Sequence, residues 1–103
     1  MTRFLIALLL ATPAAADPLP PAGFYCPVGR DVMPIIVEPN GTVGIDSLEC
    51  RGAKLSGGRL TSRRCYANGA SVSSVDLELI PLPGGGGLLH DGVRYRRQVG
   101  RCP

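Results

Sequence analysis

Short runs of alternating apolar and polar residues recur along most of this chain. In the segment 75–79 every second residue is Val or Leu, and the residues between them are acidic. A period of two is typical of a strand that buries one face. Val72 falls out of that phase, which predicts a bulge near Ser73-Ser74. Outside residues 1–16 no segment carries a helical stripe, so the pattern predicts an all-β protein.

Dipeptides that favour tight turns separate these runs: Asn40-Gly41, Gly57-Gly58, Asn68-Gly69 and Asp91-Gly92. A two-residue type I′ turn needs φ > 0 at both central residues, which Asn, Asp and Gly tolerate. We therefore expect neighbouring strands to pair as antiparallel hairpins. Pro81-Leu82-Pro83 and the run Gly84 to Gly87 interrupt the pattern and predict a loop. The expected architecture is a small antiparallel sheet or meander, or a partly closed β-barrel, stabilised by disulfides.

Residues 1–16 have the composition of a cleavable export signal. Arg3 precedes an apolar run from Phe4 to Ala11, and small residues follow at Ala14 and Ala16. The apolar run is much shorter than the roughly 20 residues that a membrane-spanning helix needs. We expect cleavage after Ala16, no membrane span afterwards, and a periplasmic or secreted location.

The remaining residues are enough for one domain with a thin core. Residues 17–25 are rich in proline and predict an extended N-terminal tail, followed by a single β-domain at residues 26–103. The whole chain carries 11 basic and 8 acidic residues, and without Arg3 the net charge would be about +2. This charge is too small to indicate nucleic acid or an anionic membrane as a partner. We expect a monomer that binds no nucleic acid.

Four cysteines in an exported protein indicate disulfides; they are Cys26, Cys50, Cys65 and Cys102. Three pairings are conceivable. In a hairpin centred on Gly57-Gly58, Cys50 and Cys65 lie at equal distances from the turn and face each other. Opposed Cα atoms are about 4.5–5.5 Å apart, within the range of about 4.4–6.8 Å that a disulfide spans. We therefore predict Cys50–Cys65, which leaves Cys26 to pair with Cys102.

Metal binding and redox chemistry are the alternatives for these cysteines, but the chain has no C-x-x-C pair and a single histidine, His90. We expect no metal and no cofactor. His90 precedes the Asp91-Gly92 turn, which favours a structural role over a catalytic or metal-ligand role. No Gly-x-Ser-x-Gly elbow is present for nucleophilic catalysis. The sequence predicts a protein that is not an enzyme; catalysis would require His90 to face a carboxylate across a concavity.

Basic side chains gather in two parts of the sequence: Arg51, Lys54, Arg59, Arg63 and Arg64 on the central hairpin, and Arg94, Arg96, Arg97 and Arg101 near the C-terminus. Guanidinium groups pair with carboxylates and phosphates through two hydrogen bonds. We select Arg59, Arg63, Arg94 and Arg96 as candidate partner-binding residues. The alternative is an ordinary solvated β-surface.

The spacing of several short motifs resembles small exported proteins of unassigned function in Gram-negative bacteria. These motifs are Cys26-Pro27, Gly41-x-x-Gly44-Ile45-Asp46 leading to Cys50, Cys65 followed by Asn68-Gly69, and Tyr95-Arg96-Arg97 followed by Cys102. A fainter similarity, through Phe24-Tyr25-Cys26, is to the periplasmic inhibitors of C-type lysozyme, which are small disulfide-bearing β-barrels. That family inserts a Ser-Gly-x-x-Tyr loop into the lysozyme cleft, and the segment Ser56 to Leu60 has no tyrosine at the matching place.

We expect a non-enzymatic, exported binding or envelope-associated module whose partner is a protein or an acidic component of the envelope. The alternative is a proteinaceous inhibitor of a hydrolase such as lysozyme. An inhibitor would need a protruding, rigid loop, which would be Ser56 to Leu60 or Pro81 to Leu89. A small hydrolase is the least favoured of the three hypotheses.

Overall fold

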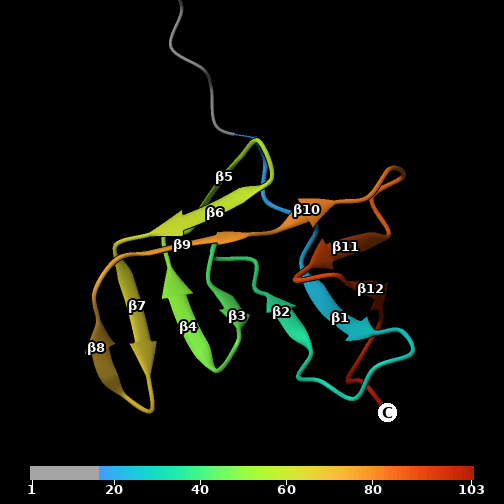
Figure 1. Cartoon of the computed structure of the whole chain (residues 1–103), viewed down its shortest axis with the longest axis horizontal. Coiled ribbons are helices and arrows are strands. Elements are labelled where there is room, and N and C mark those ends of the chain that lie inside the picture. Colours follow the sequence, from blue (N-terminus) through green and yellow to red (C-terminus); the bar gives the residue numbers. More distant parts are fainter. Residues whose placement is uncertain (1–16) are drawn as a thin grey trace, which may run out of the picture.

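Twelve strands in two sheets make up the part of the chain that the structure, a computed structural model, describes: residues 17–103 (Figure 1). The strands are β1 (Gly23–Pro27), β2 (Ile35–Val37), β3 (Val43–Ile45), β4 (Leu48–Arg51), β5 (Lys54–Ser56), β6 (Arg59–Ser62), β7 (Arg64–Ala67), β8 (Ala70–Val72), β9 (Val75–Glu78), β10 (Ile80–Pro81), β11 (Gly87–His90) and β12 (Val93–Gln98). The expected export signal lies outside the described residues. Residues 17–103 contain no helix, which confirms the all-β prediction for them. Accordingly, none of these residues belongs to a helix that could cross a membrane.

Nine strands form one sheet in the order β10-β11-β12-β1-β2-β3-β4-β7-β8, and three form a second in the order β5-β6-β9. Every pairing between these strands is antiparallel. Most strands pair with their neighbours along the chain, and both sheets are open. Of the architectures expected, the antiparallel meander is the one that forms.

One long hairpin contributes strands to both sheets. Its outer part is the β4–β7 pair, and its inner part is the β5–β6 pair. Cys50 opposes Cys65, and Leu55 opposes Leu60, so both halves keep the register set by Gly57-Gly58. Between the halves the chain turns, and β5 and β6 run across the ends of β4 and β7 (Figure 1). The predicted register is therefore confirmed on both sides of this corner.

Both predicted disulfides are present, Cys50–Cys65 within the long hairpin and Cys26–Cys102 between the two ends of the domain. The second bridge joins segments that also pair as strands, because β1 lies beside β12 with Phe24 opposite Gln98. The start and the end of the described chain are thus held together by a disulfide and a backbone ladder.

Three of the predicted turns have positive φ at both central residues, as a type I′ turn requires: Gly57-Gly58, Asn68-Gly69 and Asp91-Gly92. A fourth turn of this kind, Asp46-Ser47 between β3 and β4, was not predicted, because neither residue is glycine.

The turn type predicted at Asn40-Gly41 is wrong, although the hairpin itself is present. Gly41 has φ of 88°, whereas Asn40 has no positive φ. Pro39 fixes a φ near −65°, which suits the first central position of a type I turn. Pro39 and Asn40 are then the two central residues, and the left-handed conformation falls on Gly41, directly after them. The amide of Gly41 donates to the Glu38 carbonyl oxygen at 3.1 Å, and the Glu38 amide donates to the Thr42 carbonyl oxygen at 2.9 Å.

The bulge predicted near Ser73-Ser74 is instead a crossing between sheets. β8 ends at Val72 in the nine-stranded sheet, and β9 begins at Val75 in the three-stranded sheet. The phase change of the hydrophobic pattern therefore marks a change of sheet. The alternation beyond it is confirmed, since Leu79 is fully buried and the acidic residues of β9 are exposed.

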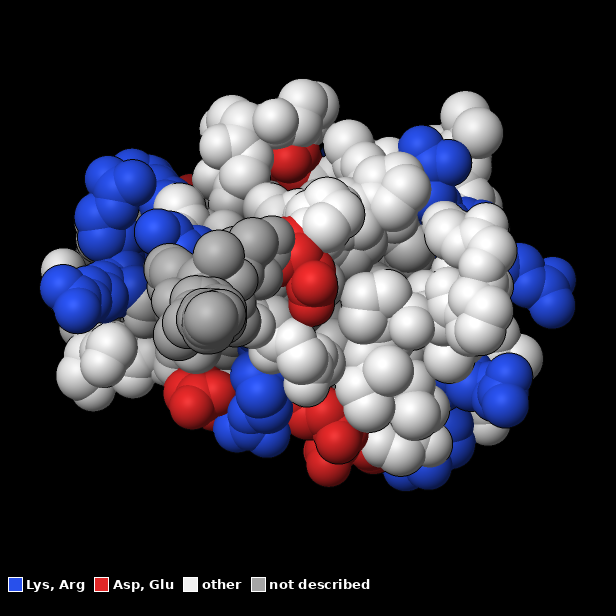
Figure 2. Space-filling view, turned by 90° about the horizontal axis from the view of Figure 1, so that it is seen from above, with Lys and Arg blue, Asp and Glu red and all other residues white. Residues whose placement is uncertain are grey.

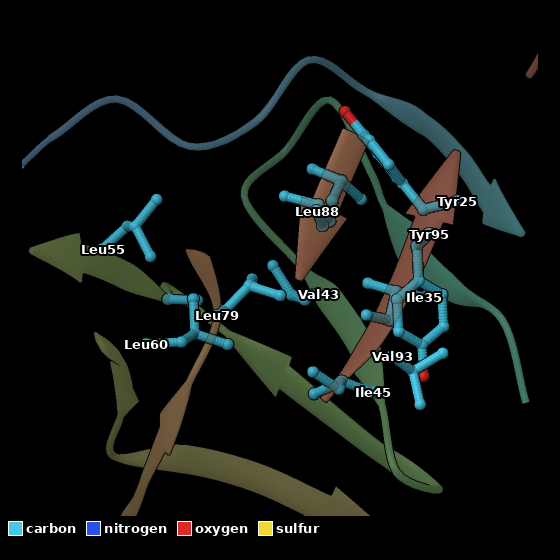
Figure 3. Close-up of a cluster of buried hydrophobic side chains, with 12 residues drawn as sticks. Tyr25, Ile35, Val43, Ile45, Leu55, Leu60, Leu79, Leu88, Val93 and Tyr95 are labelled. Atoms are coloured by element: carbon cyan, nitrogen blue, oxygen red, sulfur yellow. The ribbon is translucent and has the colours of Figure 1, made fainter. Parts of the chain in front are cut away.

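Side chains from both sheets converge on one core (Figure 3). Leu55 and Leu60 come from the three-stranded sheet, and Tyr25, Val43 and Leu88 come from the nine-stranded one.

Part of the segment 17–25, expected as a tail, also contacts this body. Leu19 packs against the core, the Asp17 amide donates to the Leu55 carbonyl oxygen at 2.8 Å, and β1 begins at Gly23.

Candidate functional site

The bend in the long hairpin creates a cleft of about 710 Å³ at the corner between the two sheets. We call this the basic cleft. Its lining residues are Arg51, Gly52, Lys54, Thr61, Ser62, Arg63, Arg64, Ser74, Val75 and Asp76. The residues come from both strands of the hairpin and from the segment that crosses between the sheets. Its volume lies within the range of about 300–1,000 Å³ that small-molecule sites occupy.

Two residues let the backbone turn at this corner. Gly52 adopts a φ of 58°, a conformation that glycine reaches without steric cost. Ser62 is buried, and its hydroxyl donates to the Arg51 carbonyl oxygen at 2.8 Å while it accepts from the Arg64 amide at 3.1 Å. The hydroxyl thus satisfies two backbone groups at the point where the ladder is interrupted.

The same register brings two arginines together. Arg51 opposes Arg64 on the β4–β7 ladder. Like charges directly opposite each other are destabilising. The Arg51 guanidinium lies 4.9 Å from the centroid of the Tyr66 ring and 3.1 Å from a Glu49 carboxylate oxygen. The Arg64 guanidinium instead lies beside Gly52: a Cβ atom added to Gly52 would be 3.2 Å from it.

Positive charge exceeds negative charge around the basic cleft. Among residues 17–103, Lys54, Arg63 and Arg64 form no ion pair. The carboxylate of Asp76, which also lines the cleft, is 3.1 Å from Arg59. Surface ion pairs of this kind stabilise a protein by less than about 1 kcal/mol. The cleft therefore presents unpaired cations beside the hydroxyl groups of Thr61 and Ser74, a combination suited to an anion.

A second hollow, of about 410 Å³, lies against β12. Arg94 and Arg96 line it together with apolar side chains and glycines of neighbouring segments: Val28, Leu82, Pro83, Gly86 and Gly87. Both arginines are exposed, while Val93 before them and Tyr95 between them are buried. Arg94 and Arg96 therefore point outward on the same face of β12.

The four candidate partner-binding residues do not form one site. Arg63 lines the basic cleft, and Arg94 and Arg96 line the second hollow. Arg59 is exposed on β6 and lines neither; its guanidinium pairs with Asp76. Figure 2 likewise shows basic residues gathered mostly toward the two ends of one face, with acidic residues between them.

Three lining residues of the basic cleft, Arg51, Lys54 and Arg64, were not among the four candidates. The signal for two of them was available, because the hairpin register that pairs Cys50 with Cys65 also pairs Arg51 with Arg64. The alternation of apolar and polar residues did not predict the bend of the hairpin that forms the cleft beside these two arginines.

His90 is buried at the end of β11 and lines neither hollow. Its Nδ1 is 2.6 Å from the Glu78 carbonyl oxygen, and its Nε2 is 2.9 Å from Asp46 Oδ2. A carbonyl and a carboxylate only accept hydrogen bonds, so the ring makes both bonds when it carries a proton on each nitrogen. His90 does face a carboxylate, but with both nitrogens occupied and 5% of the residue exposed it supports the structural role.

Two buried tyrosines have altered acidity. Burial raises the pKa of Tyr25, and Arg97 opposes that rise. Burial also raises the pKa of Tyr95, with further increases from the nearby carboxylates of Asp46 and Asp91 and an opposing effect of Arg30. Both phenols lie in the core, and neither lines the basic cleft.

Of the two loops that an inhibitor could use, one is held against the protein body. Leu79 donates its amide to the Gly58 carbonyl oxygen at 2.9 Å, and the Gly57 amide donates to Asp17 Oδ2 at 3.1 Å. The other loop joins β10 to β11 and projects beyond the sheet (Figure 1). Its glycines at 84–86 have open space around them.

No family model, no curated protein and no solved structure matches this chain.

Proposed function

We propose that this protein is an exported, non-enzymatic binding module that holds an anionic group of its ligand in the basic cleft. The observation that carries the proposal is the concentration of Lys54, Arg63 and Arg64 around one cleft, where none of them pairs with a carboxylate of residues 17–103. Each of these side chains is exposed at the cleft and can exchange water for an anion. Two arginines offer paired N–H groups to a phosphate or carboxylate.

Export through residues 1–16 to the periplasm or beyond is part of this proposal. Two disulfides are compatible with an oxidising compartment. The small exported proteins of Gram-negative bacteria that the motif spacing resembles occupy the same compartment. An anionic envelope component or the acidic face of an envelope protein would then be available as ligand.

The alternative function is inhibition of a hydrolase such as lysozyme. Only the loop at Pro81 to Leu89 projects in the way such a contact needs, because the turn at Gly57-Gly58 is hydrogen-bonded to Asp17 and Leu79. An assay of lysozyme activity with the purified protein tests this alternative directly. Inhibition that disappears when the loop is shortened would favour it over the binding module.

Binding of inorganic pyrophosphate, followed by the amide chemical shifts of the labelled protein, tests the anion site. We expect the largest shifts at residues 51–54, 61–64 and 74–76. The variant R63Q/R64Q should weaken binding by about tenfold, since two charge-assisted hydrogen bonds are lost in a solvent-exposed site. The matched control, R94Q/R96Q, removes the same net charge from the second hollow and should bind pyrophosphate as the unaltered protein does.

Equal weakening by both variants would mean that pyrophosphate responds only to net charge, and the proposed site would be wrong. Shifts spread evenly over the basic surface would carry the same meaning. Absence of any shift at residues 51–64 would also overturn it.

A further inference from the structure

Four large hydrophobic side chains of residues 17–103 are exposed. They are Val28, Val32, Met33 and Val99, with exposed fractions of 47%, 39%, 57% and 97%. Three lie in the β1–β2 connection, and Val99 directly follows β12. The Cys26–Cys102 disulfide links the segment after β12 to the end of β1, from which the β1–β2 connection begins. A hydrogen bond from the Val28 amide to the Arg94 carbonyl oxygen, 2.8 Å long, holds that connection beside the start of β12 (Figure 1).

Arginines accompany these aliphatic side chains. Arg30 lies within the β1–β2 connection, Arg101 follows Val99, and Arg94 and Arg96 project from β12. The second hollow joins the two kinds of side chain, because Val28, Leu82 and Pro83 line it beside Arg94 and Arg96. Asp31 is the one acidic side chain in residues 28–34 and 99–103, and the carboxylates of Asp46 and Asp91 lie near Tyr95, between Arg94 and Arg96. We call these aliphatic and arginine residues together the aliphatic–arginine end.

We propose that the aliphatic–arginine end docks on the surface of a bilayer that contains anionic phospholipids. Exposed aliphatic groups gain by leaving water for the acyl boundary, and arginines beside them pair with lipid phosphates. The aliphatic side chains lie in the β1–β2 connection and directly after β12, where they can enter an interface without moving a strand. None of the four is aromatic, whereas protein–protein contacts draw much of their binding energy from tryptophan and tyrosine.

The overall net charge does not reveal this surface. Eight acidic residues in residues 17–103 nearly balance the basic ones over the whole domain, but most of them lie outside the two segments that form this end. An electrostatic contact with a membrane depends on charges within about one Debye length of it. The local surplus of arginine is therefore the relevant quantity.

This inference goes beyond the proposed anion site and does not depend on it. β1 and β12 lie at one side of the nine-stranded sheet, and β7, which borders the basic cleft, lies toward the other side (Figure 1). A molecule docked by the aliphatic–arginine end would leave the basic cleft open to a ligand.

Co-sedimentation of the purified protein, with both disulfides formed, tests the docking surface. The vesicles contain either phosphatidylcholine alone or phosphatidylcholine mixed with phosphatidylglycerol. We expect binding to the mixed vesicles, weakened by salt. The variant V32S/M33S should lower the partition coefficient by about tenfold, because two aliphatic side chains no longer enter the interface. The conservative variant V32L/M33L should retain binding.

The charge-matched pair separates this surface from the basic cleft. R94Q/R96Q should weaken vesicle binding by about tenfold or more, whereas R63Q/R64Q should not. The reverse order, or equal losses, would overturn the docking surface and show that the cleft or net charge attracts the vesicles. The inference is also wrong if the protein ignores phosphatidylglycerol or if V32S/M33S binds normally. Pyrophosphate binding in the cleft remains a separate result in every case.

Discussion

The imidazole of His90 is 2.9 Å from the carboxylate of Asp46, across a separation of 44 residues in the chain. The contact links the end of β11 to the turn between β3 and β4, and the other ring nitrogen links β11 to the end of β9. Three segments from both sheets therefore meet at one buried side chain. This arrangement makes His90 a structural tie, and substitution of its partner tests that role.

We expect Asp46→Asn to lower the free energy of unfolding by about 1 kcal/mol. Asn tolerates the positive φ of this turn position, so the change removes the charge-assisted bond and leaves the backbone intact. The estimate is reduced from the usual value for charged hydrogen bonds because the Asp46 side chain is 59% exposed. Asp91→Asn is the matched control: it makes the same change at a type I′ turn with φ of 52°, and the Asp91 carboxylate forms no ion pair with His90. Equal effects in urea denaturation would contradict the tie.

Much of the fold followed from the sequence because turn chemistry sets register locally. Gly57-Gly58 alone places Cys50 opposite Cys65, and the corner preserves that register because it takes up equal numbers of residues on both strands. The pairing of β1 with β12 had no comparable local signal; it joins segments some 70 residues apart. The turn at Asp46-Ser47 lacked the glycine that marks the others. Its conformation depends on the surrounding structure, including the contact with His90.

The candidate site was less accessible to sequence reasoning than the fold. Outward-pointing arginines follow from alternation, as Arg94 and Arg96 show. Which arginines share a hollow depends on where the long hairpin bends. That bend depends on Gly52 and on the two backbone hydrogen bonds of Ser62. A glycine within a strand can mark a bend, but the sequence does not show which arginines the bend brings together.

Alkaline pH should destabilise the protein. The pKa values of Tyr25 and Tyr95 are raised in the folded state by burial. Below pH 10.0, the ordinary value, both phenols are protonated in the folded and the unfolded chain, so their contribution is constant. As the pH rises further, the unfolded chain ionises first, and stability falls until the folded-state pKa is passed. Urea denaturation on either side of pH 10 measures this loss.

Tyr95→Phe should make that alkaline loss smaller, because one of the two buried phenols is gone. Tyr66→Phe serves as the control, since Tyr66 lies beneath the Arg51 guanidinium and outside the core cluster. An unchanged pH dependence in Tyr95→Phe would show that burial of this phenol is not the cause.

Gly87 should tolerate no side chain, unlike its neighbour Gly86. A Cβ atom at Gly87 would lie 2.9 Å from the Tyr95 carbonyl oxygen, whereas one at Gly86 would meet nothing within 4 Å. Gly87→Ala must push β11 from β12 and should cost about 2 kcal/mol of unfolding free energy. Gly86→Ala should change stability by less than about 0.5 kcal/mol. Thermal unfolding of the two variants compares them, and similar midpoints would contradict the close approach of these strands.

The two disulfides should differ in their contributions to stability. Cys26–Cys102 closes a loop with a sequence separation of 76, and Cys50–Cys65 closes one of 15. In the chain-entropy model the longer loop gives about 4 kcal/mol and the shorter about 3 kcal/mol. The variant C26A/C102A should therefore unfold at lower urea concentration than C50A/C65A. The opposite order would mean that packing around the fully buried Cys50–Cys65 pair outweighs the constraint on the unfolded chain.

Ser62→Ala should damage both the corner and the basic cleft. The Ser62 hydroxyl is the partner of two backbone groups, the Arg51 carbonyl and the Arg64 amide, and its loss leaves both without that partner in a buried position. We expect a decrease of about 2 kcal/mol in unfolding free energy and weaker pyrophosphate binding, because the backbones that carry the two opposed arginines shift. Ser74→Ala is the control, since Ser74 lines the same cleft but is exposed. If Ser62→Ala loses stability yet binds pyrophosphate normally, the arrangement of Arg51 and Arg64 at the corner is not what forms the anion site.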